Sequence, residues 1–211
     1  MKIKEIKELF GTKWLSFKDA TYFNKEGKEM KWNFISRKAE AKVVTIICRS
    51  QTTGKFLLIS QPRVPVNKVV IEFPAGLIDQ GESVQTAGLR ELKEETGYEG
   101  QNITESPFVV KSAGLSDEVT AVVELEVDEK AVGKTEMENT EDIEAFWMTP
   151  EEFLKMEKKL DPTKIIIDVQ VWFYFHGLLT AEKKKLPAKK SPVKKPPAKR
   201  SPAKKPASKK K

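Results

Sequence analysis

Short apolar and β-branched runs, separated by polar turns, recur along the chain and predict strands. The runs 13–23 and 29–37 flank Asn24-Lys25-Glu26-Gly27, a good turn sequence, and therefore predict an N-terminal antiparallel hairpin. Further runs of the same kind predict strands at 43–48, 56–60, 69–73, 108–111, 119–127 and 143–148.

Two helices are expected besides the one that residues 83–96 predict. Thr149 followed by Pro150 is typical of a helix start, with Thr149 as the cap, and a last helix is predicted at about 167–180. Strands outnumber helices, and the helices flank them. We therefore expect an α/β (α+β) fold, a mixed sheet in an α/β/α sandwich, preceded by the hairpin.

The distribution of charge divides the chain. Residues 183–211 hold fourteen of the 38 basic residues and no acid, so the remainder carries 24 basic and 31 acidic residues. The remainder is rich enough in apolar residues to form a core, whereas the Lys, Pro and Ala of the tail have little to bury. We expect a hairpin subdomain (1–40), a main domain (41–182) and a disordered basic tail (183–211).

Two residue types occur once each. Cys48 lies in the strand-like run AKVVTIICRS and is expected to be a small buried hydrophobe. Because it is the single cysteine, an internal disulfide is excluded, which fits a reducing compartment. His176 cannot form a multi-histidine metal site and is expected in the core or on a helix surface.

No membrane association is expected. No signal peptide is visible at the N-terminus, MKIKEIKELFGTKW, because it lacks a continuous apolar segment. The apolar run 165–181 only reaches the lower limit of a bilayer span and includes Asp168, Gln170 and His176. A buried C-terminal helix is the better interpretation.

The segment 76–98, GLIDQGESVQTAGLRELKEETGY, holds the candidate chemistry. If it is helical from Ser83 to Thr96, then Glu91, Glu94 and Glu95 share one face. Carboxylates that are grouped in this way repel one another, and hard oxygen-seeking cations such as Mg²⁺ or Mn²⁺ are the usual compensation. A lone cluster of this kind is also typical of an ordinary charged surface helix.

Nine specified positions of this segment resemble the signature of the Nudix hydrolases: Gly76, Glu82, Arg90, Glu91, Leu92, Glu94, Glu95, Gly97 and an apolar residue at Tyr98. One local departure is Gly88, where Ala would suit a helix better. The resemblance implies an enzyme that directs water onto a phosphorus of a nucleoside diphosphate linked to another group.

The same resemblance implies roles for individual residues. The Ala75 carbonyl, Glu91 and Glu95 would bind divalent metal with help from Glu94, and Arg90 would orient a glutamate. Family members that hydrolyse nucleotide sugars often supply a general base from a loop outside the motif. Such a loop here carries Glu141, the first choice, and Glu138, the second.

More of the chain, roughly residues 10–181, resembles one subgroup, the ADP-ribose or ADP-sugar pyrophosphatases, through IEFPAGLIDQGE, ISQPRVP and the hairpin. In that subgroup Trp14 and Trp32 would sandwich adenine across a homodimer, although hairpin packing would also account for them. The other expected substrate-binding residues are Arg37, Arg63, Glu72, Gly76 and Leu77.

One departure concerns the substrate. The subgroup usually has Pro before the Gly-Leu that follows the motif, whereas this chain has Ala113. ADP-ribose or a related ADP-sugar, cleaved to AMP and a sugar phosphate with Mg²⁺, is the leading expectation. A dinucleotide, an oxidised nucleotide or an RNA cap remains an alternative substrate. A nucleic-acid-associated nucleotide sensor is an alternative of another class.

The basic tail suggests partners of its own. Fourteen positive charges would attract DNA or RNA without sequence specificity, or an import receptor, or the acidic body itself. Ser191 and Ser201 lie in repeats that resemble linker-histone tails and proline-directed kinase sites. The tail therefore suggests a location in the nucleus as well as the cytoplasm.

Overall fold

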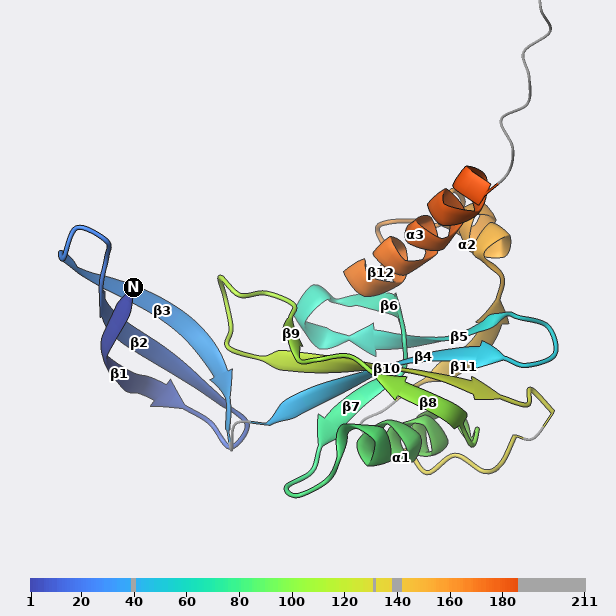
Figure 1. The fold of residues 1–211 in the computed structure, drawn as a ribbon, viewed down its shortest axis with the longest axis horizontal. Helices are drawn as coiled ribbons and strands as arrows, with labels where there is room; N and C mark the ends of the chain where they lie inside the picture. Colours follow the sequence, from blue (N-terminus) through green and yellow to red (C-terminus); the bar gives the residue numbers. More distant parts are fainter. Residues whose placement is uncertain (39–40, 131, 138–141, 186–211) are drawn as a thin grey trace, which may run out of the picture.

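A computed structural model describes residues 1–38, 41–130, 132–137 and 142–185, and it has a small N-terminal sheet beside a larger mixed sheet (Figure 1). Helices cover both faces of the larger sheet, which confirms the expected α/β/α fold. Three helices are present in the described residues: α1 (Val84–Thr96), α2 (Pro150–Glu157) and α3 (Val169–Lys185).

The N-terminal sheet contains the predicted hairpin, formed by β2 (Leu15–Phe23) and β3 (Glu29–Arg37). The turn forms because Gly27 adopts φ 76° and the Asn24 side chain accepts hydrogen bonds from the backbone of Glu26 and Lys28. An additional strand, β1 (Lys2–Gly11), pairs antiparallel with β2. The expected hairpin is therefore part of a three-stranded sheet.

The larger sheet is mixed, as expected. Its main path runs β12-β6-β5-β4-β10-β8, and β10 pairs parallel with β4 while β12 pairs parallel with β6. Three further strands join this path: β7 beside β4, β9 beside β10, and β11 beside β5. The bounds are β4 (Lys42–Ser50), β5 (Phe56–Arg63), β6 (Lys68–Glu72), β7 (Ala75–Ile78), β8 (Gln101–Glu105), β9 (Val109–Val110), β10 (Val119–Val127), β11 (Glu144–Met148) and β12 (Ile165–Ile167), with a 3₁₀ turn at Val64–Val66.

Helix α1 covers one face of the larger sheet. Its buried residues Ala87 and Leu92 pack in a cluster with Val44 of β4 and Val123 of β10. Gly88 belongs to the same contact, because a methyl group there would lie 2.8 Å from a methyl group of Val123. Close packing against the sheet therefore explains the glycine in this helix.

Helices α2 and α3 cover the other face. Phe153 of α2 and Phe175 of α3 stack at 4.6 Å between ring centroids, and both join the cluster that contains Phe73. The start of α2 is confirmed, since Thr149 and Glu152 form a reciprocal capping box.

The last helix begins later in the chain than predicted. Ile165–Ile167 forms strand β12, which pairs with β6, and α3 begins only at Val169. No helix among the described residues is long and apolar enough to cross a membrane.

The N-terminal sheet is fastened to the larger sheet through β3. The backbone N–H of Ile35 donates to Leu115 at 2.9 Å, and the N–H of Asp117 donates back to Ile35 at 3.3 Å. The Ser36 hydroxyl also bonds to the Asp117 carboxylate at 2.8 Å. The loop that contains Ala113 is therefore held against the N-terminal sheet, beside the edge formed by β9 (Figure 1).

Candidate active site

The candidate site is built on a turn that leads from β7 into α1. Ser83 caps the helix by accepting a hydrogen bond from the Thr86 backbone N–H at 3.1 Å, and Gly97 ends it in the left-handed conformation. Before the cap, Glu82 accepts from the Asp79 backbone N–H at 3.1 Å. The helix therefore starts at a fixed position relative to β7.

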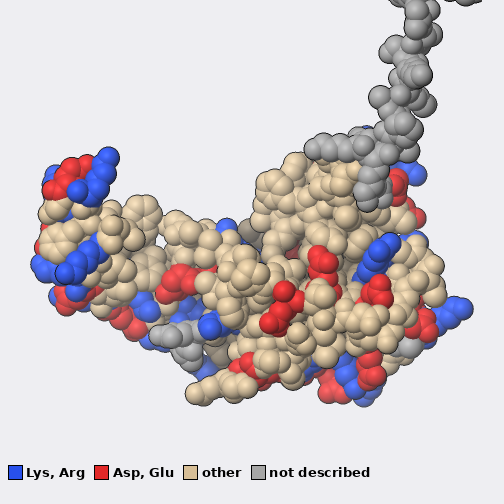
Figure 2. Space-filling model, viewed as in Figure 1, with Lys and Arg blue, Asp and Glu red and all other residues tan. Residues whose placement is uncertain are grey.

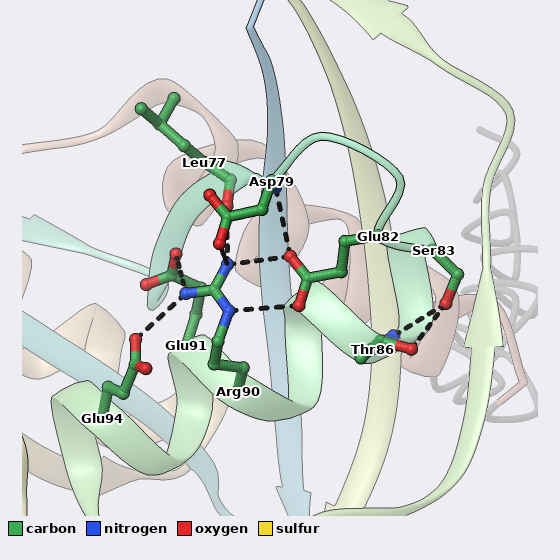
Figure 3. Close-up of polar contacts among 8 residues, drawn as sticks. All are labelled: Leu77, Asp79, Glu82, Ser83, Thr86, Arg90, Glu91 and Glu94. Carbon is green, nitrogen blue, oxygen red and sulfur yellow. Dashed lines mark hydrogen bonds and ion pairs between the residues drawn. The ribbon is translucent and has the colours of Figure 1, made fainter.

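Arg90 joins this turn to the glutamates of α1 (Figure 3). Its Nε and Nη2 donate to the two carboxylate oxygens of Glu82 at 3.1 and 3.0 Å, and Nη2 also donates to the Leu77 carbonyl at 2.9 Å. Its Nη1 donates to Glu91 at 2.8 Å and to Glu94 at 3.0 Å. These bonds raise the pKa of Arg90 and lower the pKa of Glu82, so both stay charged.

Glu91 lies directly against the turn. A methyl group added at Gly76 would stand 1.9 Å from the carboxyl carbon of Glu91 and 2.1 and 2.2 Å from its oxygens. Such distances are far shorter than any non-bonded contact, so only glycine leaves room for this carboxylate.

Glu95 faces the other side of the same turn. Its side chain is 4% exposed, and its Oε2 accepts from the Ala75 backbone N–H at 3.2 Å. A carboxylate that is buried this deeply requires compensation of its charge. The structure thus brings together Ala75, Gly76, Glu91, Glu94 and Glu95, as the spacing predicts.

The donor set suits a hard divalent cation. Carboxylates and a nearby backbone carbonyl are the oxygen ligands that Mg²⁺ and Mn²⁺ prefer, and Gly76 leaves the space in which the carboxylate of Glu91 lies. Among the residues that the structure describes, no three acidic, His or Cys side chains converge as a ready ligand group. The fit to such a cation therefore rests on the chemistry of the oxygen donors at this turn.

A cleft of about 600 Å³ opens beside the turn and contains most of the expected substrate-binding residues. Arg63 makes a two-pronged ion pair with Glu72, both N–O distances being 2.7 Å, which raises the pKa of Arg63. Arg37 forms an ion pair with Glu118 on the opposite wall. Gly76 and Leu77 form the wall nearest to α1.

Three charged residues of this cleft were not expected from the sequence: Lys111, Glu118 and Asp168. Asp168 follows β12, where its carboxylate accepts from the Gln170 backbone N–H at 2.8 Å and so caps α3. An acid between an apolar strand and a helix is a signal that sequence reasoning could have used. Lys111 and Glu118 carry no comparable local signal.

The two tryptophans lie far apart along the N-terminal sheet. Trp32 pairs with Ala20, and its ring N–H donates to the Gly114 carbonyl at 3.2 Å. The Trp14 carbonyl accepts a hydrogen bond from the Lys38 N–H. Lys38 is six residues after Trp32, which is about 20 Å in an extended strand. Both rings are at least half exposed. One copy of the chain therefore does not stack both rings on the same ligand.

Several expected residues lie outside the described part of the chain: Glu138, Glu141, Ser191 and Ser201. Their roles, the tail's partners and the nuclear location stay predictions. The segment just before Glu138 contacts the end of α1. The Gly133 N–H donates to Gly97 at 2.7 Å, and the Glu136 N–H donates to the Glu94 carbonyl at 2.8 Å.

The single cysteine and the single histidine lie apart from this site. Cys48 is fully buried in β4, where burial raises the pKa of its thiol. His176 is on α3, stacked on Trp172 and 3.2 Å from a Glu157 oxygen. The expectations of a buried cysteine and of a histidine on a helix surface are confirmed.

Comparison with known proteins agrees with this site. Residues 39–169 match the NUDIX domain. The ADP-ribose pyrophosphatase of Saccharomyces cerevisiae is 35% identical over 192 residues, which cover 85% of this chain and 83% of the yeast protein. The ADP-sugar pyrophosphatase of Mus musculus is 37% identical over 123 residues, 55% of this chain and 56% of the mouse protein.

A solved structure shares the fold. The crystal structure of an ADP compounds hydrolase superposes with a TM-score of 0.66 at 17% identity, covering 86% of this chain and 95% of that one. The domain match and the yeast relative confirm the family expected from the motif. The chain belongs to the Nudix hydrolase family, and it is a pyrophosphatase enzyme of that family.

Proposed function

We propose that this enzyme hydrolyses the diphosphate bond of ADP-ribose or a related ADP-sugar, giving AMP and a sugar phosphate. The observation that carries the proposal is the position of Glu91 against Gly76, a residue that lines the same cleft as Arg37 and Arg63. Relatives named ADP-ribose pyrophosphatase and ADP-sugar pyrophosphatase support it.

The glutamates of α1 would hold the divalent metal. Glu91, Glu95 and the Ala75 carbonyl are its proposed ligands, with Glu94 assisting, because all of them are oxygen donors gathered at one turn. When bound, Mg²⁺ or Mn²⁺ neutralises diphosphate oxygens and lowers the pKa of the attacking water. Arg90 contributes by holding Glu91 and Glu94 in place through its Nη1.

Two arginines of the cleft would bind the diphosphate. Arg63 and Arg37 each present a guanidinium group whose geometry matches two phosphate oxygens. Both are engaged with carboxylates, Glu72 and Glu118, which keep the guanidinium groups oriented toward the cleft. Glu72 thus contributes to the site by orienting Arg63.

The proton of the water must be taken by a base. Glu141, or Glu138 as second choice, is the proposed base. The segment 132–137, which leads to these residues, bonds to the backbone at the end of α1. That contact brings the described part of this segment to the end of the helix that carries Glu94.

Adenine would stack on tryptophan. Because Trp14 and Trp32 lie far apart along one sheet, a sandwich of both rings requires a second copy of the chain, and a homodimer is part of the proposal. The exposed apolar side chains of Ile3, Ile6 and Met30 on the N-terminal sheet are consistent with such an interface. Ala113 adjoins Gly114, the hydrogen-bond partner of Trp32, so its effect falls beside the ring of Trp32.

A substrate panel tests the proposal. The full-length protein with Mg²⁺ is given ADP-ribose, other ADP-sugars, dinucleotides, oxidised nucleoside diphosphates and capped RNA, and the released nucleotide is identified by chromatography. Preferential release of AMP from an ADP-sugar is the expected result. Preference for a dinucleotide, an oxidised nucleotide or an RNA cap would show that this compound, and not an ADP-sugar, is the substrate. Binding without turnover of any compound would favour a nucleotide sensor.

A further inference from the structure

A second groove, of about 660 Å³, lies on the face of the larger sheet opposite to α1. Helices α2 and α3 pack over β4, β5 and β6 on this face, but they leave the side toward β10 and β8 uncovered. The floor of the groove is apolar, with Ile47 and Phe56 from the sheet, and Tyr174 and Leu178 from α3 form its wall. It therefore offers both apolar surface and an open edge.

The open edge of the groove is acidic. Glu124 and Glu126 are two residues apart on β10, so their side chains point to the same face of the sheet, about 7 Å apart. Glu124 is exposed and makes no hydrogen bond or ion pair to any described residue, and Glu126 accepts only from the neutral amides of Asn102 and Gln51. Among the described residues that line the groove, Arg49 is the single basic one. Figure 2 shows acidic side chains across this region, below α3.

The chain itself supplies a cationic segment at this place. The groove reaches Ala181, and α3 ends at Lys185, about 6 Å further along the helix axis. Residues 186–211 follow, with eleven Lys and Arg and no acid. Lys189 and Lys190 come only four and five residues after the helix, a reach of about 13–18 Å in extended chain.

We propose that residues 186–211 dock in this groove of the same chain, with lysines at Glu124 and Glu126 and with Pro, Ala and Val side chains on the apolar floor. Tethering places the segment at an effective concentration on the order of millimolar, so weak ion pairs are sufficient. The groove lies on the opposite face of the sheet from the glutamates of α1, so docking leaves the catalytic cleft open. Phosphate on Ser191 or Ser201 would repel the carboxylates and release the segment.

Zero-length carbodiimide cross-linking of the full-length protein maps the contact, because it joins Lys only to a carboxylate at ion-pair distance. An equal mixture of ¹⁴N and ¹⁵N protein separates contacts within one chain from contacts between chains. We expect cross-links from lysines 189–211 to Glu124 and Glu126, without isotope mixing. Cross-links spread over all exposed acids, isotope-mixed cross-links, or none at all would overturn the proposal.

A second measurement does not depend on the reacting carboxylates. Amide spectra of the tail are recorded at low and high salt for three full-length proteins: wild type, Glu124→Gln with Glu126→Gln, and a control with Glu105→Gln and Glu144→Gln. The control removes two exposed acids outside the groove. We expect the tail shifts of the groove variant at low salt to equal those of wild type at high salt, with the control unchanged. Equal salt dependence in all three proteins would overturn the proposal.

Discussion

The contact between Gly76 and Glu91 gives the sharpest test of the active-site geometry. In Gly76→Ala the new methyl group would meet the Glu91 carboxyl carbon at 1.9 Å, whereas contacts under 3.0 Å are essentially never seen. The carboxylate must therefore move by about 1 Å or more. Because it is the end of a flexible side chain, it can do so while the backbone stays in place.

We expect Gly76→Ala to lower the catalytic rate while the stability of the fold changes little. A misplacement of about 1 Å in a reacting assembly lowers the rate about 100-fold, which corresponds to about 2.7 kcal/mol of activation free energy. We expect kcat/KM for ADP-ribose with Mg²⁺ to fall by about that factor in Gly76→Ala. The thermal midpoint, followed by circular dichroism, is expected to change by only a few degrees.

Gly177→Ala is the matched control. It lies on α3 with nothing within 4 Å of the added methyl group, and alanine favours a helix over glycine by about 1 kcal/mol. We expect unchanged activity and slightly higher stability. If folded Gly76→Ala keeps kcat/KM within twofold of wild type, the position of Glu91 against the turn has no part in the mechanism.

Four further outcomes follow from the contacts described. Glu94→Gln should lower kcat at least about 100-fold while nucleotide affinity, measured by calorimetry, stays within a few-fold. Arg90→Lys cannot reproduce the two-pronged bond to Glu82, which is mostly buried, so denaturant titration should show about 1–3 kcal/mol lower unfolding free energy. Trp32→Ala should raise KM for ADP-ribose about tenfold through lost stacking, with kcat little changed in steady-state kinetics. Burial raises the pKa of Cys48 and keeps its thiol protonated, so a thiol reagent at pH 8 should label only unfolded protein.

The parts of the site that sequence could predict depend on local spacing. The positions of Glu91, Glu94 and Glu95 relative to one another follow from the helical repeat, and Ser83 and Thr149 cap helices as their residue types suggest. The turn between β2 and β3 was predictable for the same reason, since Asn24 and Gly27 determine it locally.

Irregular strands were not predictable. In β1 the apolar residues Ile3, Ile6 and Phe10 do not alternate, because the pairing with β2 shifts register between Ile3 and Glu5 and again between Glu8 and Phe10. Strand β8 is largely polar, and Asn102 within it has a positive φ of 55°. The period-2 pattern on which strand prediction depends is absent in both.

Contacts between residues far apart in the chain could not be predicted from the sequence either. Arg37 was expected at the cleft, but its partner Glu118 is 81 residues away and reaches it only because β3 meets the loop before β10. Asp168 enters the cleft because β12 pairs with β6, which divides an apolar run that reads as one helix. Such residues are identified by topology rather than by motif.

The most direct test of the central claim is the rate of AMP release from ADP-ribose by the full-length enzyme, measured with Mg²⁺ and again with excess chelator. We predict release of AMP and ribose phosphate in equal amounts that requires the metal and is lost in Glu94→Gln. Equal rates with and without metal, or no AMP from any ADP-sugar with either Mg²⁺ or Mn²⁺, would contradict it.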